Sequence, residues 1–402
     1  MDFLKILAAA ALFPCLGCQI GYYIHSAYHQ TKLIHGRRPI TWVLENSHLT
    51  PEQKRKLQLV RKVKEFGESK LGLARSRNYT TFVQLDEPYV TYIVQAAYAL
   101  ELKPYLWRFP LVGAVPYKGY FRRKLAEEEA SSFDPEKFDT YVRGVSAYST
   151  LGWFQDSVLS SMLRYEDHDL VELILHESIH TTLYIKNAAE FNERLATFLG
   201  HEGMKMYYLE TEGPHSPHLE KAFADSHDRN LFSAFLTREI EALKVWYTEN
   251  AGKVTKGAKA DRLQRIHERF VTEIKPRLKT TNYSEFEKRE LNNAFLLAYQ
   301  TYEYSLDDFA KLFSRFNHDF KKTLEYLRSL DGEENPAQKL KEFVSGGSTS
   351  ATSATSTEAA RAPWILLRRR TRLSGGGPSP AGSHSRIHCF NIRKFSKASR
   401  SS

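Results

Sequence analysis

One pentapeptide constrains the local fold of this chain more than any other stretch. Residues 176–180 read His-Glu-Ser-Ile-His. On an α-helix, residues four apart lie on one face, so His176 and His180 can offer ring nitrogens to one metal ion. Asp169 and Glu172 have the spacing of a capping box, and an apolar run without Gly or Pro leads into the motif. We therefore predict a largely buried helix that carries a two-histidine metal site.

Glu177 follows the first histidine and would stand beside the ion rather than bind it. A carboxylate in that position can take a proton from an attacking water and later return it to the leaving amine. The spacing His-Glu-x-x-His is typical of zinc proteases, although short motifs also arise by chance in a chain with 15 histidines. The pattern predicts one Zn²⁺ as cofactor and Glu177 as the catalytic residue.

A catalytic zinc needs a third protein ligand, and the next expected helix offers candidates. Asn187 and Glu190 have a cap-like spacing at the start of a helix predicted for residues 188–198. Two helices joined by a short turn pack antiparallel, so a carboxylate on the second can reach the metal. Position alone leaves both Glu193 and Glu190 open. The face of Glu193 also carries the small residues Ala196, Thr197 and Gly200. The weaker candidates are His201 and Glu202.

The segment Asn192-Glu193-Arg194-Leu195-Ala196 resembles the Asn-Glu-x-x-Ala motif of glu-zincin peptidases, whose glutamate binds zinc. This resemblance favours Glu193 over Glu190 as the third ligand. More narrowly, the chain resembles the bacterial family described as predicted aminopeptidases, which are lipoprotein-like proteins. The resemblance is carried by residues 17–23, 38–40, 119–121 and 145–154, by the His-Glu helix and by residues 191–193. It implies a zincin-like two-helix zinc site and aminopeptidase activity. Ser178 and the tail beyond about residue 345 depart from the family.

Two further roles stay open in the sequence. The oxyanion formed during amide hydrolysis needs a donor, and Tyr148, Tyr184 and Tyr207 are candidates among 22 tyrosines. An aminopeptidase also binds the α-amine of its substrate, for which Glu190 or Glu202 could serve. The stretch at residues 148–154 is interpreted either as ordinary strand and turn or as an edge strand that holds extended substrate.

The positive charge of the chain belongs to its C-terminal tail. The formal charge is +10, but residues 346–402 hold ten Lys/Arg and one acid, or +9, which leaves about +1 for the rest. This tail is rich in Ser, Thr, Gly and Pro and is predicted to be disordered. A nearly neutral body argues against a nucleic-acid partner.

The N-terminus resembles a targeting segment. An apolar run from Ile6 to Leu16 precedes Gly17-Cys18, similar to a bacterial lipobox in which the cysteine receives lipid. We predict a signal peptide or lipoprotein anchor at residues 1–18, with an uncleaved signal anchor as the alternative. The other cysteines are Cys15 and Cys389, so residues 19–345 hold no disulfide or cysteine nucleophile. The body is expected to face the periplasm, tethered to a membrane of the bacterial envelope.

The remaining patterns predict a mainly α fold with a smaller β portion. Thr50-Pro51 with Gln53 predicts a helix start, running to about Phe66. Further helices are expected at 88–102, 231–250, 258–274, 283–302 and 305–330, and strands within 105–121 and 140–150. The zinc-peptidase body thus comprises a strand-containing part, about residues 19–165, and a helical part, about residues 166–345.

These observations predict a membrane-tethered zinc metallopeptidase that acts on peptides, with an aminopeptidase favoured by the family resemblance. A zinc endoprotease of the cell envelope is the first alternative. The second is a non-catalytic envelope interaction protein with a vestigial zinc site. The position of Glu177 argues against this second alternative, because a structural zinc site normally has four protein ligands and no poised base.

Overall fold

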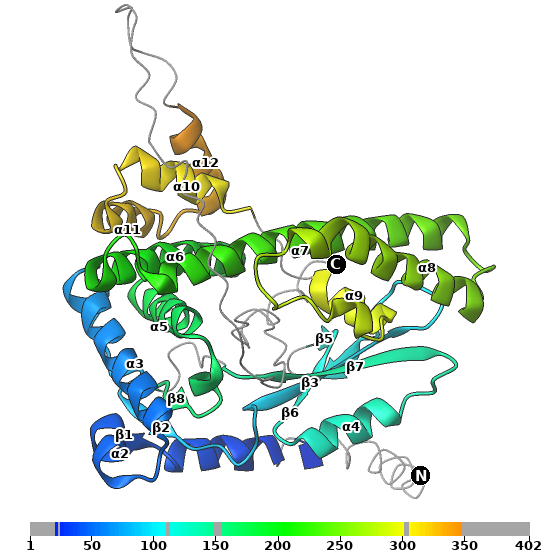
Figure 1. Ribbon diagram of the computed structural model, residues 1–402, viewed down its shortest axis with the longest axis horizontal. Helices are drawn as coiled ribbons and strands as arrows, with labels where there is room; N and C mark the ends of the chain where they lie inside the picture. The colour runs from blue at the N-terminus through cyan, green and yellow to red at the C-terminus, as the bar shows by residue number, and fades with distance from the viewer. Residues whose placement is uncertain (1–20, 23–24, 110–112, 148–154, 301–304, 347–402) are drawn as a thin grey trace, which may run out of the picture.

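Helices dominate the structure, a computed structural model that describes residues 21–22, 25–109, 113–147, 155–300 and 305–346 (Figure 1). The expected signal segment, the stretch at residues 148–154 and nearly all of the basic tail lie outside these ranges. The helices are α2 (Ile40–Asn46), α3 (Pro51–Ser69), α4 (Arg123–Ser131), α5 (Asp167–Thr182), α6 (Ala189–Glu212), α7 (Pro217–Glu249), α8 (Lys256–Arg269), α9 (Asn293–Gln300), α10 (Asp307–Arg315), α11 (Phe320–Ser329) and α12 (Pro336–Ser345). The strands are β1 (Arg38–Pro39), β2 (Thr81–Val83), β3 (Thr91–Tyr98), β4 (Trp107–Phe109), β5 (Gly113–Val115), β6 (Lys118–Tyr120), β7 (Phe138–Val145) and β8 (Val158–Leu159). A mainly α fold with a small β portion agrees with the sequence.

The two longest strands, β3 and β7, form an antiparallel sheet with β6 in the order β6-β3-β7. The helix predicted for residues 88–102 is therefore wrong, since β3 occupies Thr91–Tyr98. Ile93 pairs with Gly119 on one side and with Arg143 on the other. The run contains Thr, Ile, Val and Tyr, which favour strands once neighbouring strands are available to pair with. The predicted strand region 105–121 contains β4, β5 and β6, and the region 140–150 overlaps β7, which begins at Phe138.

The start of α3 is confirmed in atomic detail. Thr50 Oγ1 accepts a hydrogen bond from the backbone N–H of Gln53 at 3.2 Å, and Gln53 Oε1 accepts one from the N–H of Thr50 at 2.9 Å. The helix continues past the predicted end at Phe66 to Ser69. A Cβ added to Gly67 would lie 3.2 Å from the side chain of Leu175, so this glycine allows α3 to approach α5 closely.

The main hydrophobic core surrounds α5, as its apolar sequence predicts. Fully buried residues on this helix are Leu170, Val171, Leu173, Ile174, Leu175 and Ile179. Burial of each such aliphatic side chain contributes roughly 1.5–3 kcal/mol, so tertiary packing fixes this helix. The core also includes residues of α3, α6, α10, α11 and α12.

Both predicted N-caps of the motif helices are wrong. The helix α5 begins at Asp167 with Glu166 at the cap position, and α6 begins at Ala189 with Ala188 there; neither cap residue makes a side-chain cap bond. The helix α6 also runs well beyond the predicted end at residue 198. It passes through Gly200 because that glycine packs against α5 rather than ending the helix.

A second hydrophobic cluster joins α7, α8 and α9 around Phe232, Phe270 and Phe286. The helix α7 is longer than predicted because it begins at Pro217, where Ser216 accepts a cap hydrogen bond from Leu219 N. The helix predicted for 283–302 is confined to α9. The one predicted for 305–330 is divided into α10 and α11 at Asn317 and His318, whose φ angles are 53° and 61°.

The long helices α6 and α7 follow one another across one side of the molecule, with α5 beneath α6 (Figure 1). The sheet β6-β3-β7 and helix α4 lie on the opposite side, and α10–α12 pack on the outer side of α6. Within the described ranges, no helix has both the length and the apolar character needed to cross a bilayer.

Candidate metal centre

The helices α5 and α6 pack antiparallel, as their contacts show. Near the start of α5, Glu172 Oε2 lies 3.2 Å from Nδ1 of His201, far along α6. Near the end of α5, His180 Nε2 lies 3.8 Å from Oε1 of Glu193, close to the start of α6. Residues that come late on one helix therefore face residues that come early on the other. This arrangement brings the sequence-predicted ligands together.

A buried asparagine fixes the turn between the two helices. The side chain of Asn192 is fully buried. Its Oδ1 accepts a hydrogen bond from Ile185 N at 2.9 Å, and its Nδ2 donates one to Ile185 O at 2.7 Å. Asn187 occupies the left-handed region with φ 66°, which asparagine tolerates better than most residues. In the sequence Asn192-Glu193, the first residue thus fixes the turn, and the second is the candidate metal ligand.

Three donor groups converge at the contact of α5 and α6. The Nε2 atoms of His176 and His180 lie 3.1 Å apart, and carboxylate oxygens of Glu193 lie 3.9 Å and 3.8 Å from them. Tetrahedral zinc with bonds of about 2.0–2.1 Å places neighbouring nitrogen ligands about 3.3 Å apart. Across the part of the chain that the structure describes, this is the one group of three or more His, Cys, Asp or Glu residues close enough to share an ion.

The environment keeps both histidines in the form that binds metal. Burial, together with the charge of His180, places the pKa of His176 well below its ordinary value. Burial also lowers the pKa of His180, although the charge of Glu193 acts in the opposite direction. Both rings are therefore neutral at pH 7 and can offer a lone pair. A hydrogen bond between the His176 ring and the backbone of Ala196 helps to orient that ring.

Glu177 is buried, with 4 % of its surface exposed, and adjoins the histidine pair on α5. Ser178, the residue that departs from the family pattern, donates its hydroxyl to Ile174 O at 2.7 Å. That hydroxyl is satisfied within its own helix, so the departure leaves the ligand geometry intact.

The C-terminal end of α5 is tied to the loop after α3. Thr182 Oγ1 accepts a hydrogen bond from Ala74 N at 2.9 Å. Thr181 Oγ1 accepts one from Asn78 Nδ2 at 3.1 Å. These contacts hold the last turn of α5, which follows directly on His180.

The rival ligands lie outside the three-residue group. Glu190 is exposed in the first turn of α6. His201 contacts Glu172, and Glu202 accepts hydrogen bonds from Lys205 Nζ at 2.9 Å and 2.8 Å. These pairings direct the last two side chains to other partners.

Of the two candidate oxyanion donors in the described ranges, Tyr184 lies nearer to the site. Its ring centroid is 6.3 Å from that of His180. Tyr207 lies about 21 Å further along α6 than Glu193, by the rise of 1.5 Å per residue, and packs against Phe66 in the core. The prediction of Tyr207 as a candidate oxyanion donor is therefore wrong. Tyr148 falls outside the described residues.

A buried polar network next to the site was not found by sequence reasoning. Glu172 stands one helical turn before His176, with its carboxylate in contact with His201. Further toward the start of α5, His168 Nε2 lies 3.0 Å from Asp225 Oδ2 of α7. The four-residue spacing of His168, Glu172 and His176 was a signal for a polar stripe on a helix that is otherwise apolar.

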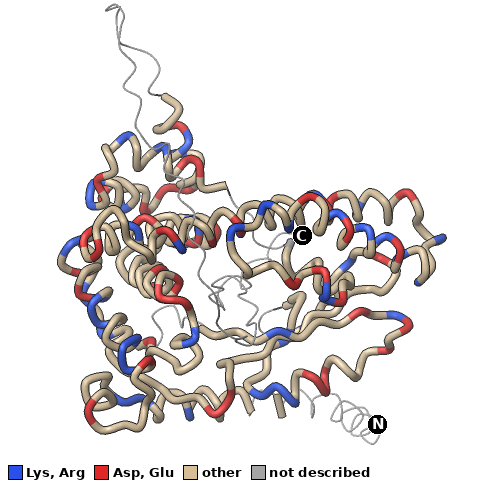
Figure 2. Tube along the Cα trace, viewed as in Figure 1, with Lys and Arg blue, Asp and Glu red and all other residues tan. Residues whose placement is uncertain are grey.

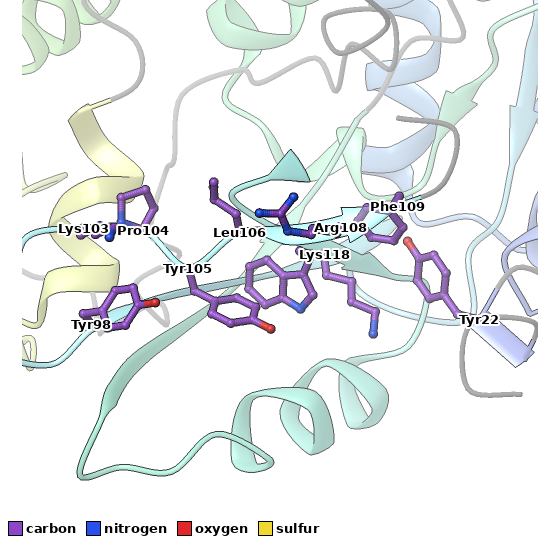
Figure 3. A pocket seen from close by; sticks show the side chains of 10 residues that line it. Tyr22, Tyr98, Lys103, Pro104, Tyr105, Leu106, Arg108, Phe109 and Lys118 are labelled. Atoms are coloured by element: carbon purple, nitrogen blue, oxygen red, sulfur yellow. The ribbon is translucent and has the colours of Figure 1, made fainter. Parts of the chain in front are cut away.

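A cavity of about 580 Å³ lies away from these helices, beside the β4–β5 hairpin (Figure 3). Its aromatic wall includes Tyr98, Tyr105 and Trp107. Glu129 accepts hydrogen bonds from the indole N–H of Trp107 at 2.8 Å and from Lys118 Nζ at 2.9 Å. Glu129 thus pairs with two residues of the cavity wall, and the wall includes none of the three converging donors.

The fold and the donor group define a mostly helical protein with two histidines and one carboxylate on an antiparallel helix pair. The family described as "Putative aminopeptidase" matches residues 21–342, and the chain belongs to this family. Membership indicates a peptidase with a peptide substrate. No curated protein and no solved structure matches the chain.

Proposed function

We propose that this protein is a zinc-dependent aminopeptidase. The observation that carries the proposal is the convergence of His176 Nε2, His180 Nε2 and the Glu193 carboxylate within 4.8 Å of one another. Two neutral imidazoles and one carboxylate form a donor set that suits Zn²⁺ and leaves a position for substrate or water. The 3.1 Å between the two nitrogens fits such an ion.

The residues present therefore fit one zinc ion, held by His176, His180 and Glu193. Zinc bound there would supply Lewis acidity toward the scissile carbonyl and lower the pKa of water at the site. The antiparallel packing of α5 and α6 fixes the three ligands relative to one another, because they come from two rigid helices rather than from a mobile loop.

Glu177 acts in this proposal as the general base and acid. It takes a proton from the attacking water and returns it to the leaving amine, which converts a poor leaving group into a neutral one. Its burial beside the histidines excludes bulk water, which strengthens its interaction with a developing charge. Tyr184, whose ring lies 6.3 Å from that of His180, would donate to the oxyanion.

The choice of exopeptidase rests on the family. An aminopeptidase recognises a free α-amine, for which a carboxylate near the metal is needed. Glu202 is paired with Lys205, whereas Glu190 is exposed in the first turn of α6. We therefore assign Glu190 rather than Glu202 as the candidate amine ligand.

We also propose attachment to a bacterial envelope membrane, with the body in the periplasm. The support is the sequence at Gly17-Cys18, which resembles a lipobox. Figure 2 shows acidic and basic residues interspersed over the described body, which does not favour a nucleic-acid partner. Lipid labelling of the wild type and of Cys18→Ser tests the anchor: label on both proteins would exclude lipidation at Cys18.

The decisive experiment compares wild-type protein with Glu177→Gln and with Glu220→Gln, at an exposed position of α7, as a matched carboxylate control. We expect equal zinc content in all three proteins. Hydrolysis of free-amine peptides should fall at least about 100-fold in Glu177→Gln, since general acid–base catalysis contributes about 10²–10⁴-fold. Retained activity in Glu177→Gln would contradict the mechanism.

Peptides with acetylated N-termini separate the remaining outcomes. An aminopeptidase cleaves the free-amine peptides and leaves the acetylated ones intact. Cleavage of both kinds at the same rate would instead identify an endoprotease. A zinc-loaded wild type that cleaves neither would indicate a non-catalytic protein.

A further inference from the structure

A second, smaller cavity of about 250 Å³ lies where β7 meets α9 and the segment before it. Strand β7 is an edge strand of its sheet, and α9 packs beside it, with the rings of Tyr141 and Phe295 5.1 Å apart. The cavity wall includes Tyr141 and Arg143 of β7, and Arg289 and Tyr299 from the α9 region. Tyr141 and Arg143 are two apart on one strand, so their side chains lie on the same face.

Among the described residues, the positive charge of this cavity is not balanced by carboxylates. Its wall holds three arginines and one glutamate. This glutamate, Glu127, is already paired with one of the arginines, because its Oε1 accepts a hydrogen bond from Arg123 Nε at 2.7 Å. Arg143 and Arg289 form no ion pair with any residue in the described ranges, and Arg143 Nε is shielded from solvent without a hydrogen-bond partner there. A guanidinium held in this way normally has an anionic partner.

Three tyrosines of the wall offer hydroxyl groups that can donate a hydrogen bond. The hydroxyls of Tyr89, Tyr141 and Tyr299 make no hydrogen bond to the described part of the chain. Burial raises the pKa of Tyr141, and it raises the pKa of Tyr299 to about 12. Both hydroxyls therefore keep their protons at neutral pH and can donate to an anion.

Packing holds one side of the cavity in place. A Cβ on Gly144 would overlap the ring of Tyr89, so this ring lies directly against the strand backbone. The guanidinium of Arg164 covers the same ring, with Cζ 4.5 Å from its centroid. Tyr89 is thus fixed between Gly144 and Arg164 before any ligand binds, which lowers the entropy lost on binding.

We propose that this cavity is a binding site for an oxyanion, either a carboxylate or a phosphate group, held by Arg143 and Arg289 and by the surrounding tyrosine hydroxyls. The planar guanidinium group matches both anions through paired N–H donors. None of the predicted zinc ligands lines the cavity. Anion binding here is therefore independent of the proposed peptidase activity.

Calorimetric titration of the full-length protein in a buffer without phosphate or carboxylate tests the site. The probes are inorganic phosphate, N-acetylalanine and N-acetylalanine amide. Binding of phosphate alone identifies a phosphate site, and binding of N-acetylalanine but not its amide identifies a carboxylate site. Failure of both anions to bind at up to about 10 mM, or equal binding of the acid and its amide, would overturn the proposal.

Variants then locate the binding. Arg143→Gln and Arg289→Gln should each weaken it by at least about 10-fold, because each removes charge-assisted hydrogen bonds. Arg277→Gln, at an exposed arginine outside the cavity wall, should change it by less than about 2-fold. Unchanged affinity in both of the first two variants would place the anion elsewhere. His180→Ala should bind the anion as the wild type does, whatever the fate of the peptidase activity.

Thermal melting of the same variants distinguishes binding from support of the fold. An unpaired arginine that serves a ligand can be replaced without loss of stability, so Arg143→Gln and Arg289→Gln should melt no lower than the wild type. Arg143→Lys keeps the charge but loses the paired donors, and should bind with intermediate affinity. If Arg143→Gln fails to fold, the affinity of Arg289→Gln decides the proposal.

Discussion

Gly200 of α6 lies directly against His176 of α5. A Cβ on Gly200 would stand 3.2 Å from His176 Cβ and 3.3 Å from both His176 Cα and the Glu172 carbonyl oxygen. These neighbours are backbone and Cβ atoms, which cannot move aside as the end of a long side chain can. The absence of a side chain at residue 200 therefore sets the distance between the two helices that carry the converging donors.

Gly200→Ala should push α6 away from α5. Helix propensity favours alanine over glycine by about 1 kcal/mol, but overpacking costs about 1–3 kcal/mol, so the net change should be destabilising. Zinc affinity should fall as well, because Glu193 moves with α6. Urea unfolding and zinc titration measure the two effects. Gly257, which has open space around it in α8, is the matched control, and Gly257→Ala should be neutral or stabilising. Equal behaviour of the two variants would contradict the close approach.

Removal of the Glu193 carboxylate should release the metal. Replacement of residues that only orient metal ligands costs about 10–100-fold in affinity, so Glu193→Ala should lose at least about 100-fold. Metal analysis after dialysis against a chelator provides the measurement. Glu190→Ala, three residues away at an exposed position, should keep its zinc. Loss of zinc from Glu190→Ala together with retention in Glu193→Ala would identify Glu190 as the third ligand instead.

Asn192→Ala should destabilise the turn between α5 and α6. The change removes two hydrogen bonds to Ile185 and leaves a buried N–H and C=O without partners, at a cost of about 2–4 kcal/mol. Chemical denaturation measures the loss. Asn230→Ala, at an exposed position of α7, should lie within about 0.5 kcal/mol of the wild type. A similarly small effect at Asn192 would show that the turn does not need these bonds.

The contact between His168 and Asp225 should make stability depend on pH. Burial alone lowers the pKa of His168, but its contact with Asp225 and the charges of Asp169 and Asp225 outweigh burial and raise it above 6.5. Burial likewise raises the pKa of Asp225, and the contact with His168 outweighs it, so that this pKa lies below 3.8. Lys221 opposes protonation of His168, and Asn282 Nδ2 donates to Asp225 Oδ1 at 2.8 Å.

The two pKa shifts determine how folding stability changes with pH. Because the pKa of His168 is raised in the folded state, this residue contributes stability that is fully present below pH 6.5. The contribution is lost as pH rises through its folded pKa. Because the pKa of Asp225 is lowered in the folded state, this residue contributes stability above pH 3.8. The contribution is lost only as pH falls through its folded pKa. The free-energy cost of His168→Gln should therefore be larger at about pH 6 than at about pH 8.5. A cost that is constant over this range would show that His168 is neutral throughout.

Local sequence predicted which residues of α5 could form a candidate site, but not how α5 and α6 assemble around it. The pairing of His176 with His180 follows from helical periodicity, because a four-residue spacing places both side chains on one face. The choice of Glu193 over Glu190 needed the family resemblance, since both lie on roughly the same face of α6. The two predicted caps failed, since α5 begins at Asp167, before the predicted cap Asp169, and α6 has Ala188 rather than Asn187 at its cap position.

The sequence by itself determined the helix at the motif, the capping box of α3 and the donor types available for a metal, all of which depend on residues a few positions apart. Only the tertiary structure decided that Thr91–Tyr98 is a strand, that α6 packs against α5 at Gly200, and that Arg143 meets Arg289. The physical reason is the separation along the chain of the residues that interact. Helical periodicity and caps are set within one or two turns, whereas strand pairing, helix approach and a shared cavity arise from contacts between residues distant in the chain.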